Sequence, residues 1–231
     1  MKWGNRFLLK LSGEALGRRG LDPTALESIA DQIERVHKLS AEIALVVGAG
    51  NFLRGAQFRE FDRVVADQMG MLATVLNGMA LRHSLESKGI PVLLQSAIPV
   101  AYAQPLDPIG ARQALSEKKI VIFAGGTGNP FVTTDTAAAI RASEVGAKIL
   151  LKATDVPGVY SADPKKNPKA KLYRELSLDE AIAKKLNVMD LTALTICRES
   201  KITIRVFDVF CPGNLEKIVR GESIGTVVKP N

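Results

Sequence analysis

The sequence has few of the features that mark secreted, membrane or nucleic-acid-binding proteins. Its two cysteines offer neither a disulfide framework nor a CxxC motif, and we expect both to be small core residues in a reducing cytoplasm. It contains no uncharged apolar run of about 18 residues, so no membrane span is expected. Aromatic residues make up 5% of the chain, and the basic residues behind its +7 formal charge are spread out, which argues against a primary nucleic-acid role.

Motifs of several common enzyme classes are also missing. The dipeptide Gly-Lys does not occur, which excludes a P-loop, and the HRD and DFG motifs of protein kinases do not occur either. Leu53 occupies the third glycine position of a dinucleotide fingerprint, which argues against a dehydrogenase. The two histidines, His37 and His83, fall on separate predicted helices, so we predict no metal site built on protein side chains.

The sequence does contain a regular alternation of short apolar runs and amphipathic segments. This alternation predicts strands at residues 7–11, 43–47, 92–95, 120–124, 148–151 and 202–207, with a late strand at 225–229. A first helix is predicted after Asp22 as N-cap, with Pro23 in its first turn. Further helices are predicted at residues 63–88, 110–117, 134–145, 178–185, 190–200 and 215–221. Continuously apolar strands are covered on both faces, so we predict an α/β fold with a mostly parallel central sheet in a single domain, residues 1–231.

The most informative segment is residues 125–135, which read GGTGNPFVTTD and lie between a predicted strand and a predicted helix. Glycines in such a turn let backbone N–H groups approach a ligand, and the N-terminus of the following helix favours an anion. Two threonine hydroxyls and the Asp135 carboxylate stand at the same junction. This composition predicts a site that binds phosphate and sugar, which points to nucleotide chemistry.

Three other predicted strands end in residues suited to the same chemistry. Lys10 closes the first strand and can neutralise charge on a transferred phosphoryl group. The second strand leads to residues 48–51 (GAGN), and Arg54 follows as a possible bidentate phosphate ligand. Residues 152–155 (KATD) follow another strand. Each feature alone is common in proteins, but the ends of parallel strands meet at one edge of a sheet, and this convergence carries the inference.

One further candidate lies on the predicted helix that begins at residue 63. Asp67 is a carboxylate on an otherwise apolar face, where it can accept hydrogen bonds from ribose hydroxyls. The alternative is an exposed helical charge or a polar cap. The neighbouring Met69, Met71 and Leu72 are predicted to be core residues rather than ligand contacts.

Six segments of the chain, taken in their order along the sequence, resemble segments of the amino-acid kinase superfamily and, within it, of the bacterial uridylate (UMP) kinases. The likeness is carried by residues 10–16 (KLSGEAL), 48–55, 64–78 (VVADQMGMLATVLNG), 127–135 (TGNPFVTTD), 152–164 (KATDVPGVYSADP) and 188–193 (VMDLTA). The resemblance implies a three-layer α/β/α sandwich and ATP-dependent, magnesium-dependent conversion of UMP to UDP in pyrimidine biosynthesis. It also implies a cytoplasmic homohexamer, with UTP as a candidate inhibitor.

Transferred residue by residue, the resemblance divides the site between two nucleotides. The residues expected to bind ATP are Lys10, Leu11, Ser12, Gly13, Gly50, Arg54, Thr154, Tyr160 and Asp163. The residues expected to bind UMP are Ala49, Asp67, Thr127, Gly128, Asn129, Pro130, Phe131, Val132, Thr133 and Thr134. Lys10, Arg54 and Asp135 are the expected catalytic residues, with Asp135 orienting Lys10 or its neighbours and not assigned as an obligatory base.

The chain departs from the family pattern at two places. Ala49 stands where the family usually has a glycine, which is tolerable if the φ angle of Ala49 is negative. Only residues 17–21 (GRRGL) separate KLSGEAL from Asp22, where many bacterial members have a longer glycine-bearing loop associated with activation by GTP. The short loop argues against GTP activation. We hypothesise that Arg18 and Arg19 lie near a subunit interface or an effector surface.

Two other functions stay open on the sequence. A sister kinase that phosphorylates an acidic metabolite such as acetylglutamate or aspartate would share the fold, although the TGNPFVTTD segment argues against a carboxylate-bearing acceptor. A regulatory protein on the same scaffold would bind UMP or UTP without turnover, and the presence of Lys10, Arg54 and Asp135 together argues for catalysis instead.

Overall fold

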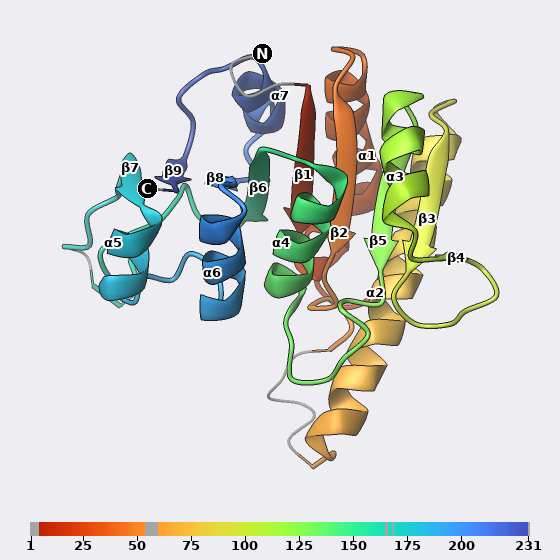
Figure 1. Cartoon of the computed structure of the whole chain (residues 1–231), viewed down its shortest axis with the longest axis horizontal. Helices are drawn as coiled ribbons and strands as arrows, with labels where there is room; N and C mark the ends of the chain where they lie inside the picture. Colours follow the sequence, from red (N-terminus) through yellow and green to blue (C-terminus); the bar gives the residue numbers. More distant parts are fainter. Residues whose placement is uncertain (1–4, 54–59, 165, 168, 231) are drawn as a thin grey trace.

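The computed structural model describes residues 5–53, 60–164, 166–167 and 169–230 (Figure 1). Within them one nine-stranded sheet has the order β4-β3-β5-β2-β1-β6-β8-β9-β7. The strands are β1 (Arg6–Leu11), β2 (Glu42–Val47), β3 (Val92–Ser96), β4 (Gln104–Pro105), β5 (Ile120–Ala124), β6 (Ile149–Thr154), β7 (Glu175–Ser177), β8 (Thr203–Asp208) and β9 (Thr226–Lys229). Only the β8–β9 pair is antiparallel among these strands, so the prediction of a mostly parallel sheet is confirmed.

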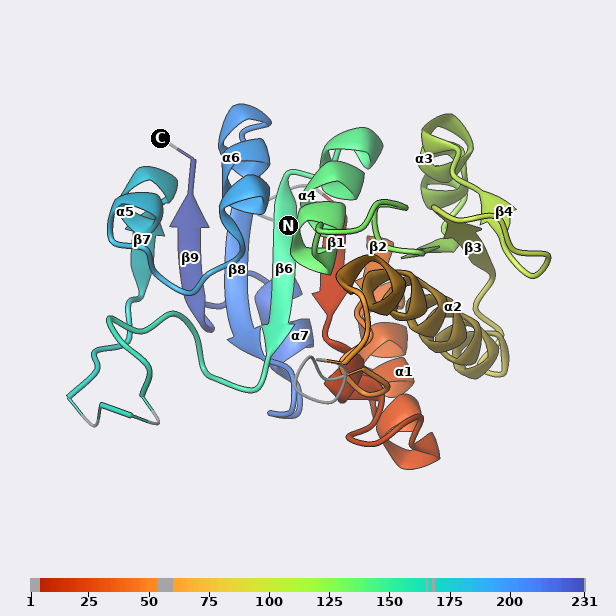
Figure 2. The same cartoon turned by 90° about the horizontal axis from the view of Figure 1, so that it is seen from below.

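Helices cover both faces of this sheet, as the view from below shows (Figure 2). One layer contains α1 (Pro23–His37), α2 (Arg63–Glu86) and α7 (Asn214–Val219). The other contains α3 (Pro108–Ser116), α4 (Thr134–Val145), α5 (Leu178–Ala183) and α6 (Leu191–Glu199). A short 3-10 helix, η1 (Gly13–Leu16), follows β1. The three-layer α/β/α architecture is therefore confirmed.

Alternate side chains of the central strands supply two separate cores. In β1, Phe7 and Leu9 pack with the α1 layer, whereas Leu8 packs with the α4 layer. All three side chains are buried. Burying a leucine side chain stabilises a fold by about 1.5–3 kcal/mol, so a strand that is apolar on both faces is stable only between two helical layers.

Helix starts follow local capping chemistry. Asp22 caps α1 by accepting hydrogen bonds from the backbone N–H groups of Thr24 and Ala25, with Pro23 at the first helical position as predicted. Asp107 and Pro108 repeat this arrangement at α3. The third helix therefore begins at Pro108, two residues before the predicted start, because the Asp-Pro cap lies ahead of the apolar periodicity.

Three local features differ from the sequence prediction. Strands β4 and β7 were not predicted, because they are too short to show a period of two. Strand β6 continues past residue 151 to Thr154, since its pairing with β8 extends through Lys152 and Thr154. Cys211 is exposed, contrary to the expectation of two core cysteines, whereas Cys197 is buried.

Helix α2 extends beyond the edge of the sheet (Figure 1). By length and apolar composition alone, it meets the criterion for a membrane-spanning helix. Core helices pass the same test, and Leu81 and Leu85 of α2 are fully buried in the α1-side core. Leu72, however, is 53% exposed, so the prediction that it is a core residue was wrong.

Candidate active site

The four strand ends singled out in the sequence lie side by side. Strands β5, β2, β1 and β6 are consecutive in the sheet and mutually parallel, so their carboxyl ends share one edge. The register pairs Lys10 of β1 directly with Lys152 of β6. Side chains at paired positions of neighbouring strands lie on the same face, so two ammonium groups are brought together.

Asp135 lies between these two lysines and contacts both. Its Oδ1 is 2.8 Å from Lys10 Nζ, and its Oδ2 accepts a hydrogen bond of 2.7 Å from Lys152 Nζ. The three side chains are 12–15% exposed. The structure thus brings together the predicted pair Lys10 and Asp135 and adds Lys152, which sequence reasoning did not assign. We call these three residues the lysine–aspartate cluster.

The electrostatics of the cluster follow from its burial and its two-to-one charge ratio. Burial by itself would raise the pKa of Asp135, but the charges and hydrogen bonds of Lys10 and Lys152 outweigh it, so the pKa is lowered. Burial lowers the pKa of Lys152, and the charge of Lys10 adds to this, while Asp135 opposes it only in part. A cluster with one excess positive charge in a partly buried place is suited to bind an anion.

Helix α4 presents Asp135 from its first turn. Thr133 is the N-cap residue and accepts hydrogen bonds from the backbone N–H groups of Asp135 and Thr136. Asp190, the N-cap of α6, accepts hydrogen bonds from the Thr133 and Thr136 hydroxyls and from Ala193 N–H. Two helix N-termini are therefore fixed to each other beside the cluster. Asp190 belongs to the VMDLTA segment, but its contacts were not predicted from the sequence.

The same segment also holds the second lysine. Lys152 Nζ donates a 2.5 Å hydrogen bond to the backbone carbonyl of Val188, in addition to its contact with Asp135. The lysine is thus held at two points. A positively charged residue in the middle of an otherwise apolar strand was the sequence signal that would have identified it.

Two glycine turns meet at the ends of β1 and β2. A Cβ on Gly13 would lie 2.4 Å from Asn51 Oδ1 and 2.5 Å from Gly50 N, so only glycine allows this approach. Asn51 and Asn77 exchange amide hydrogen bonds of 2.8 Å, and Asn77 Nδ2 also donates 2.7 Å to Gly48 O. The buried Asn77 of α2 therefore anchors the turn.

Ala49 fits the same turn without strain. The non-glycine residues with positive φ among those described are Ser40, Lys118, Phe131, Lys185 and Lys201. Ala49 is not among them, so its methyl group does not require the left-handed backbone that glycine would relieve. The condition stated for tolerating alanine at this family position is met.

A cavity of about 680 Å³ opens beside the turn, between α2 and the 125–135 segment, and we call it the acceptor pocket. This volume falls in the range of about 300–1,000 Å³ typical of small-molecule sites. Its walls include seven of the ten predicted UMP-binding residues: Ala49, Asp67, Thr127, Asn129, Val132, Thr133 and Thr134. Gly128, Pro130 and Phe131 do not line it.

Helix α2 also fixes the glycine turn of the 125–135 segment. The Thr74 hydroxyl accepts a 2.7 Å hydrogen bond from Gly125 N–H and donates one of 2.7 Å to Met71 O. Gly125 has a φ of 76°, and a Cβ there would lie 2.9 Å from Ala97 N. Thr74 is buried and lines the acceptor pocket, yet no sequence pattern indicated it.

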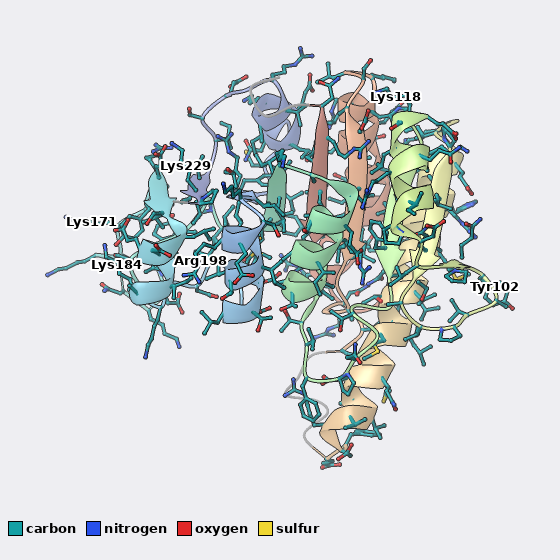
Figure 3. All side chains as sticks on the ribbon, viewed as in Figure 1. Tyr102, Lys118, Lys171, Lys184, Arg198 and Lys229 are labelled. Carbon is teal, nitrogen blue, oxygen red and sulfur yellow. The ribbon has the colours of Figure 1, made fainter. Side chains whose placement is uncertain are left out.

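A second cavity of about 470 Å³, the donor pocket, lies on the other side of the cluster. It brings together the predicted ATP-binding residues Thr154, Tyr160 and Asp163 with Lys152. Lys184 and Lys185 also line it, and Figure 3 shows Lys184 near Lys171 at the end of the molecule opposite Tyr102. The pocket is thus bordered by several ammonium groups.

The remaining predicted residues are placed as follows. Leu11 is buried at the end of β1, where it supports Ser12 and Gly13 at the start of η1. Gly50 lines the acceptor pocket, although it was predicted to bind ATP. Arg54 lies outside the described residues.

The described residues contain no group of three or more histidine, cysteine, aspartate or glutamate side chains that could hold a metal ion. At the strand ends, the carboxylate Asp135 already contacts a lysine with each of its oxygens. Among the described residues, the cluster thus presents two ammonium groups around one carboxylate.

Known proteins resemble this chain over nearly its whole length. A UMP kinase from Bacillus anthracis is 37% identical with a TM-score of 0.94, covering 98% of this chain and 96% of that one. A UMP kinase from Ureaplasma parvum is 34% identical with a TM-score of 0.91, covering 97% and 98% respectively. A uridylate kinase from Archaeoglobus fulgidus is 32% identical with a TM-score of 0.76, covering 96% and 99%.

The sequence model of the amino acid kinase family matches residues 5–208, a span that contains the lysine–aspartate cluster and the lining of both pockets. With this match and the whole-chain relatives above, the chain belongs to the amino acid kinase family.

Proposed function

We propose that the chain is an ATP-dependent UMP kinase that converts UMP to UDP in pyrimidine nucleotide biosynthesis. The observation that carries the proposal is the whole-chain likeness to UMP kinases, which extends to both sides of the site. The geometry fits, because two pockets open on either side of one cationic cluster. A single domain spanning residues 1–231 would carry the whole reaction.

UMP would occupy the acceptor pocket, with its ribose at Asp67 and its base and phosphate along residues 127–134. The Ala49 backbone would contact the same nucleotide. ATP would occupy the donor pocket with its nucleoside at Thr154, Tyr160 and Asp163, and its phosphates would extend along residues 10–13 and Arg54 toward Gly50, which lines the acceptor pocket. The lining of the two pockets supports this division, since Asp67 and Tyr160 fall on opposite sides of the cluster.

The reaction is an in-line displacement at the γ-phosphorus of ATP. An oxygen of the UMP phosphate forms a bond to phosphorus while the bond from phosphorus to the bridging β-oxygen breaks, and ADP leaves with the bonding electrons. The attacking phosphate is already ionised at neutral pH, so no general base is needed. Catalysis then depends on positioning and on neutralising negative charge.

Lys10 and Lys152 would supply that neutralisation. Lys152 lines the donor pocket, and Asp135, which contacts both ammonium groups, follows Thr134 of the acceptor pocket. Removing one such preorganised donor typically costs about 10²–10³-fold in rate. Asp135 would hold the two lysines together against their mutual repulsion, which is an orienting role.

Magnesium would enter as part of the MgATP substrate. The ion prefers octahedral oxygen ligands and commonly keeps several waters while it binds nucleotide phosphates. The described residues offer no carboxylate cluster for it, so the phosphates of ATP are its expected ligands.

A panel of acceptors tests the proposal. Formation of ADP from MgATP is measured with UMP, CMP, dUMP, acetylglutamate and aspartate at equal concentrations. UMP should have the highest kcat/KM. Turnover of a small acid in preference to UMP would make the chain a sister kinase, and tight UMP binding without turnover would make it a nucleotide sensor.

We also propose that the chain assembles as a homohexamer. Apolar residues Val65, Met69, Leu72, Leu76 and Met79 of α2 follow the 4-3-4-3 spacing of a helix-packing seam, and Val65, Leu72 and Leu76 are exposed. Tyr102, at the end of the molecule opposite Lys171 (Figure 3), and Ile109 in the first turn of α3 are further exposed apolar residues. A closed hexamer requires two kinds of contact if it has dihedral symmetry, and two separate surfaces meet this requirement.

The size of the assembly is open to direct measurement. Sedimentation equilibrium should give six times the chain mass for the wild type. A Leu72→Glu, Leu76→Glu double variant should give a smaller species with unchanged helical content. A wild-type monomer would refute the assembly proposal.

Regulation and location complete the proposal. UTP, a nucleotide with the same base and sugar as UMP, would inhibit by competing at the acceptor pocket, and GTP would not activate. Arg18 and Arg19 line a separate cavity of about 350 Å³ with Glu14, Asp155 and Phe210, which supports an effector role for this loop. We place the enzyme in the cytoplasm, where the exposed thiol of Cys211 would stay reduced.

A further inference from the structure

One oxygen of Asp67 is held by the protein and the other is left for a ligand. Oδ2 accepts a 2.7 Å hydrogen bond from Phe131 N–H and lies 2.9 Å from Arg63 Nε. Oδ1 has no hydrogen-bond partner among the described residues, although Asp67 lines the acceptor pocket. A carboxylate held in this way has a fixed direction for the oxygen that faces a ligand.

Arg63 contacts both partners of the Asp67–Phe131 hydrogen bond. It lies one turn before Asp67 on α2, and its guanidinium carbon is 5.5 Å from the centroid of the Phe131 ring. Arg63 also lines the acceptor pocket. The three residues thus join the start of α2 to a loop 64 positions away in the chain, and we call them the Arg63 clasp.

Phe131 needs such support, because its conformation is unfavourable by itself. Its φ is 67°, in the left-handed region that bulky side chains rarely adopt, and its side chain is 65% exposed. No burial in the core holds the ring in place. Its backbone N–H donates a hydrogen bond to Asp67, and its ring stacks with Arg63.

We propose that Arg63 is a positioning residue that sets the preference of this site for a ribonucleotide acceptor. By occupying Oδ2 of Asp67 and stacking on Phe131, it leaves Oδ1 aimed at a ribose hydroxyl. A deoxynucleotide leaves that oxygen without its donor, which is the strongest basis for rejecting an analogue that lacks one hydroxyl. The identity of the acceptor rests on the proposed UMP kinase function.

An ordinary surface pair would behave differently. Arg63 and Asp67 are four residues apart on an exposed helical face, a spacing at which ion pairs contribute little to stability. Such a pair, when broken, would leave the selectivity between two acceptors unchanged. A positioning role would alter selectivity while leaving the rate of phosphoryl transfer nearly intact.

The test compares binding and turnover of UMP, 2′-dUMP and 3′-dUMP by wild type and Arg63→Met. Calorimetry should show that wild type prefers UMP to at least one deoxy analogue, and that the variant binds UMP about tenfold more weakly while its affinity for that analogue changes less than about threefold. The kcat at saturating UMP should fall less than about threefold, with the loss in KM.

Two further variants separate positioning from general damage. Arg63→Lys keeps a cation near Asp67 but loses the planar stacking on Phe131, so it should recover part of the preference. Arg220→Met removes a pair of the same four-residue spacing, with Glu216 on α7, and should leave the preference unchanged. Thermal unfolding midpoints should agree among all variants within a few degrees.

The outcomes distinguish this inference from the proposed function. Parallel loss of affinity for all three nucleotides, an unchanged preference in Arg63→Met, or no preference in the wild type would each overturn the positioning role. Absence of UDP formation by wild type would refute the kinase proposal, while the calorimetric comparison would still decide the role of Arg63.

Discussion

The loops of the acceptor and donor pockets are held by different elements of the fold. On the acceptor side, side chains from α2 fix the loops: Thr74 holds Gly125, Asn77 holds Gly48 and Asn51, and Asp67 holds Phe131. On the donor side, the chain around Tyr160 is held by the Thr226 hydroxyl of β9, which accepts a hydrogen bond from Val159 N–H and donates one to Tyr173 O, together with backbone contacts. Ser161 N–H donates to Lys171 O and Tyr173 N–H donates to Val159 O.

We propose that the acceptor pocket is the more selective of the two. Side-chain hydrogen bonds from one long helix, α2, fix the loops that line the acceptor pocket before a ligand arrives. The donor pocket instead combines a loop held from β9 with the ammonium groups of Lys152, Lys184 and Lys185, which suits an anionic ligand. Lys152 of the lysine–aspartate cluster lines the donor pocket, and Asp135 follows Thr134 of the acceptor pocket, so we propose that the cluster serves both ligands.

The largest effect is expected where the two sides meet. Lys10→Ala and Lys152→Ala should each lower kcat by about 10²-fold or more, with smaller changes in the KM for UMP, because each removes charge stabilisation from the transition state. Steady-state kinetics at saturating ATP and UMP measures this. Near-normal kcat in either variant would remove that lysine from the mechanism.

Asp67→Asn addresses the acceptor side alone. It removes the charge that contacts Arg63 and that, in our proposal, a ribose hydroxyl would share, so we expect the KM for UMP to rise by about tenfold while the KM for ATP stays within about twofold. Initial rates with each substrate varied in turn separate the two constants. If the ATP constant changes and the UMP constant does not, the two sides have been assigned in reverse.

Asn77→Ala tests whether α2 supports the acceptor side structurally. The change removes the donor to Gly48 O and to Asn51 Oδ1, while Asn51 Nδ2 keeps its hydrogen bond to Gly20 O, so the free energy of unfolding should fall by about 1–3 kcal/mol. Chemical denaturation measures the loss. Thr195→Ala, at an exposed hydroxyl on α6, is a suitable control that should change stability by less than about 0.5 kcal/mol.

Tyr160→Ala is the matching change on the donor side. Its ring lines the donor pocket, and loss of a stacking surface should raise the KM for ATP by a few-fold, about 1 kcal/mol, without affecting the UMP constant. A comparable loss for both substrates would contradict the separation of the two pockets.

The pH dependence is the subtlest effect. Lys152 must be protonated to neutralise charge, and its pKa is lowered from 10.5 chiefly by burial, so kcat/KM should fall on the alkaline side at a pH below 10.5. Lys152→Arg should move this fall to higher pH, because guanidinium stays protonated. An alkaline profile identical in both proteins would exclude Lys152 as its source.

Protonation of Asp135 should have an effect on the acid side of the pH range, and this effect is on the stability of the protein. Its pKa is lowered from 3.8 in the folded protein, so its contribution to stability is present above that value and is lost as the pH falls through the folded pKa. The Asp135→Asn variant should therefore unfold with a lower free energy than wild type near neutral pH, and this difference should nearly disappear at low pH.

The sequence predicted the parts of the site that are local in the chain. Lys10 and Asp135 stand beside glycine turns at strand ends, where residue type and position together indicate function. Lys152 was missed as a cluster member, because its role depends on register: only the pairing of β1 with β6 places it opposite Lys10. Thr74 and Asn77 were missed because a polar residue inside a helix shows its partner only in three dimensions.

The fold, too, was predicted where its signal is local in the sequence and missed where it depends on tertiary structure. The parallel sheet and its two helical layers followed from apolar periodicity, and the α1 start followed from Asp22 and Pro23. The reversal of β9 and the exposure of Leu72 did not, since a strand pattern carries no direction and α2 is apolar on more than one face.

The most direct measurement follows the γ-phosphate of ATP in a single turnover. With ATP labelled at that phosphate and UMP bound to excess enzyme, the label should appear in the β-phosphate of UDP, and Lys10→Ala should slow its appearance by about 10²-fold or more. Label released only as free phosphate, or retained in ATP when both nucleotides are bound, would contradict transfer from the donor pocket to the acceptor pocket.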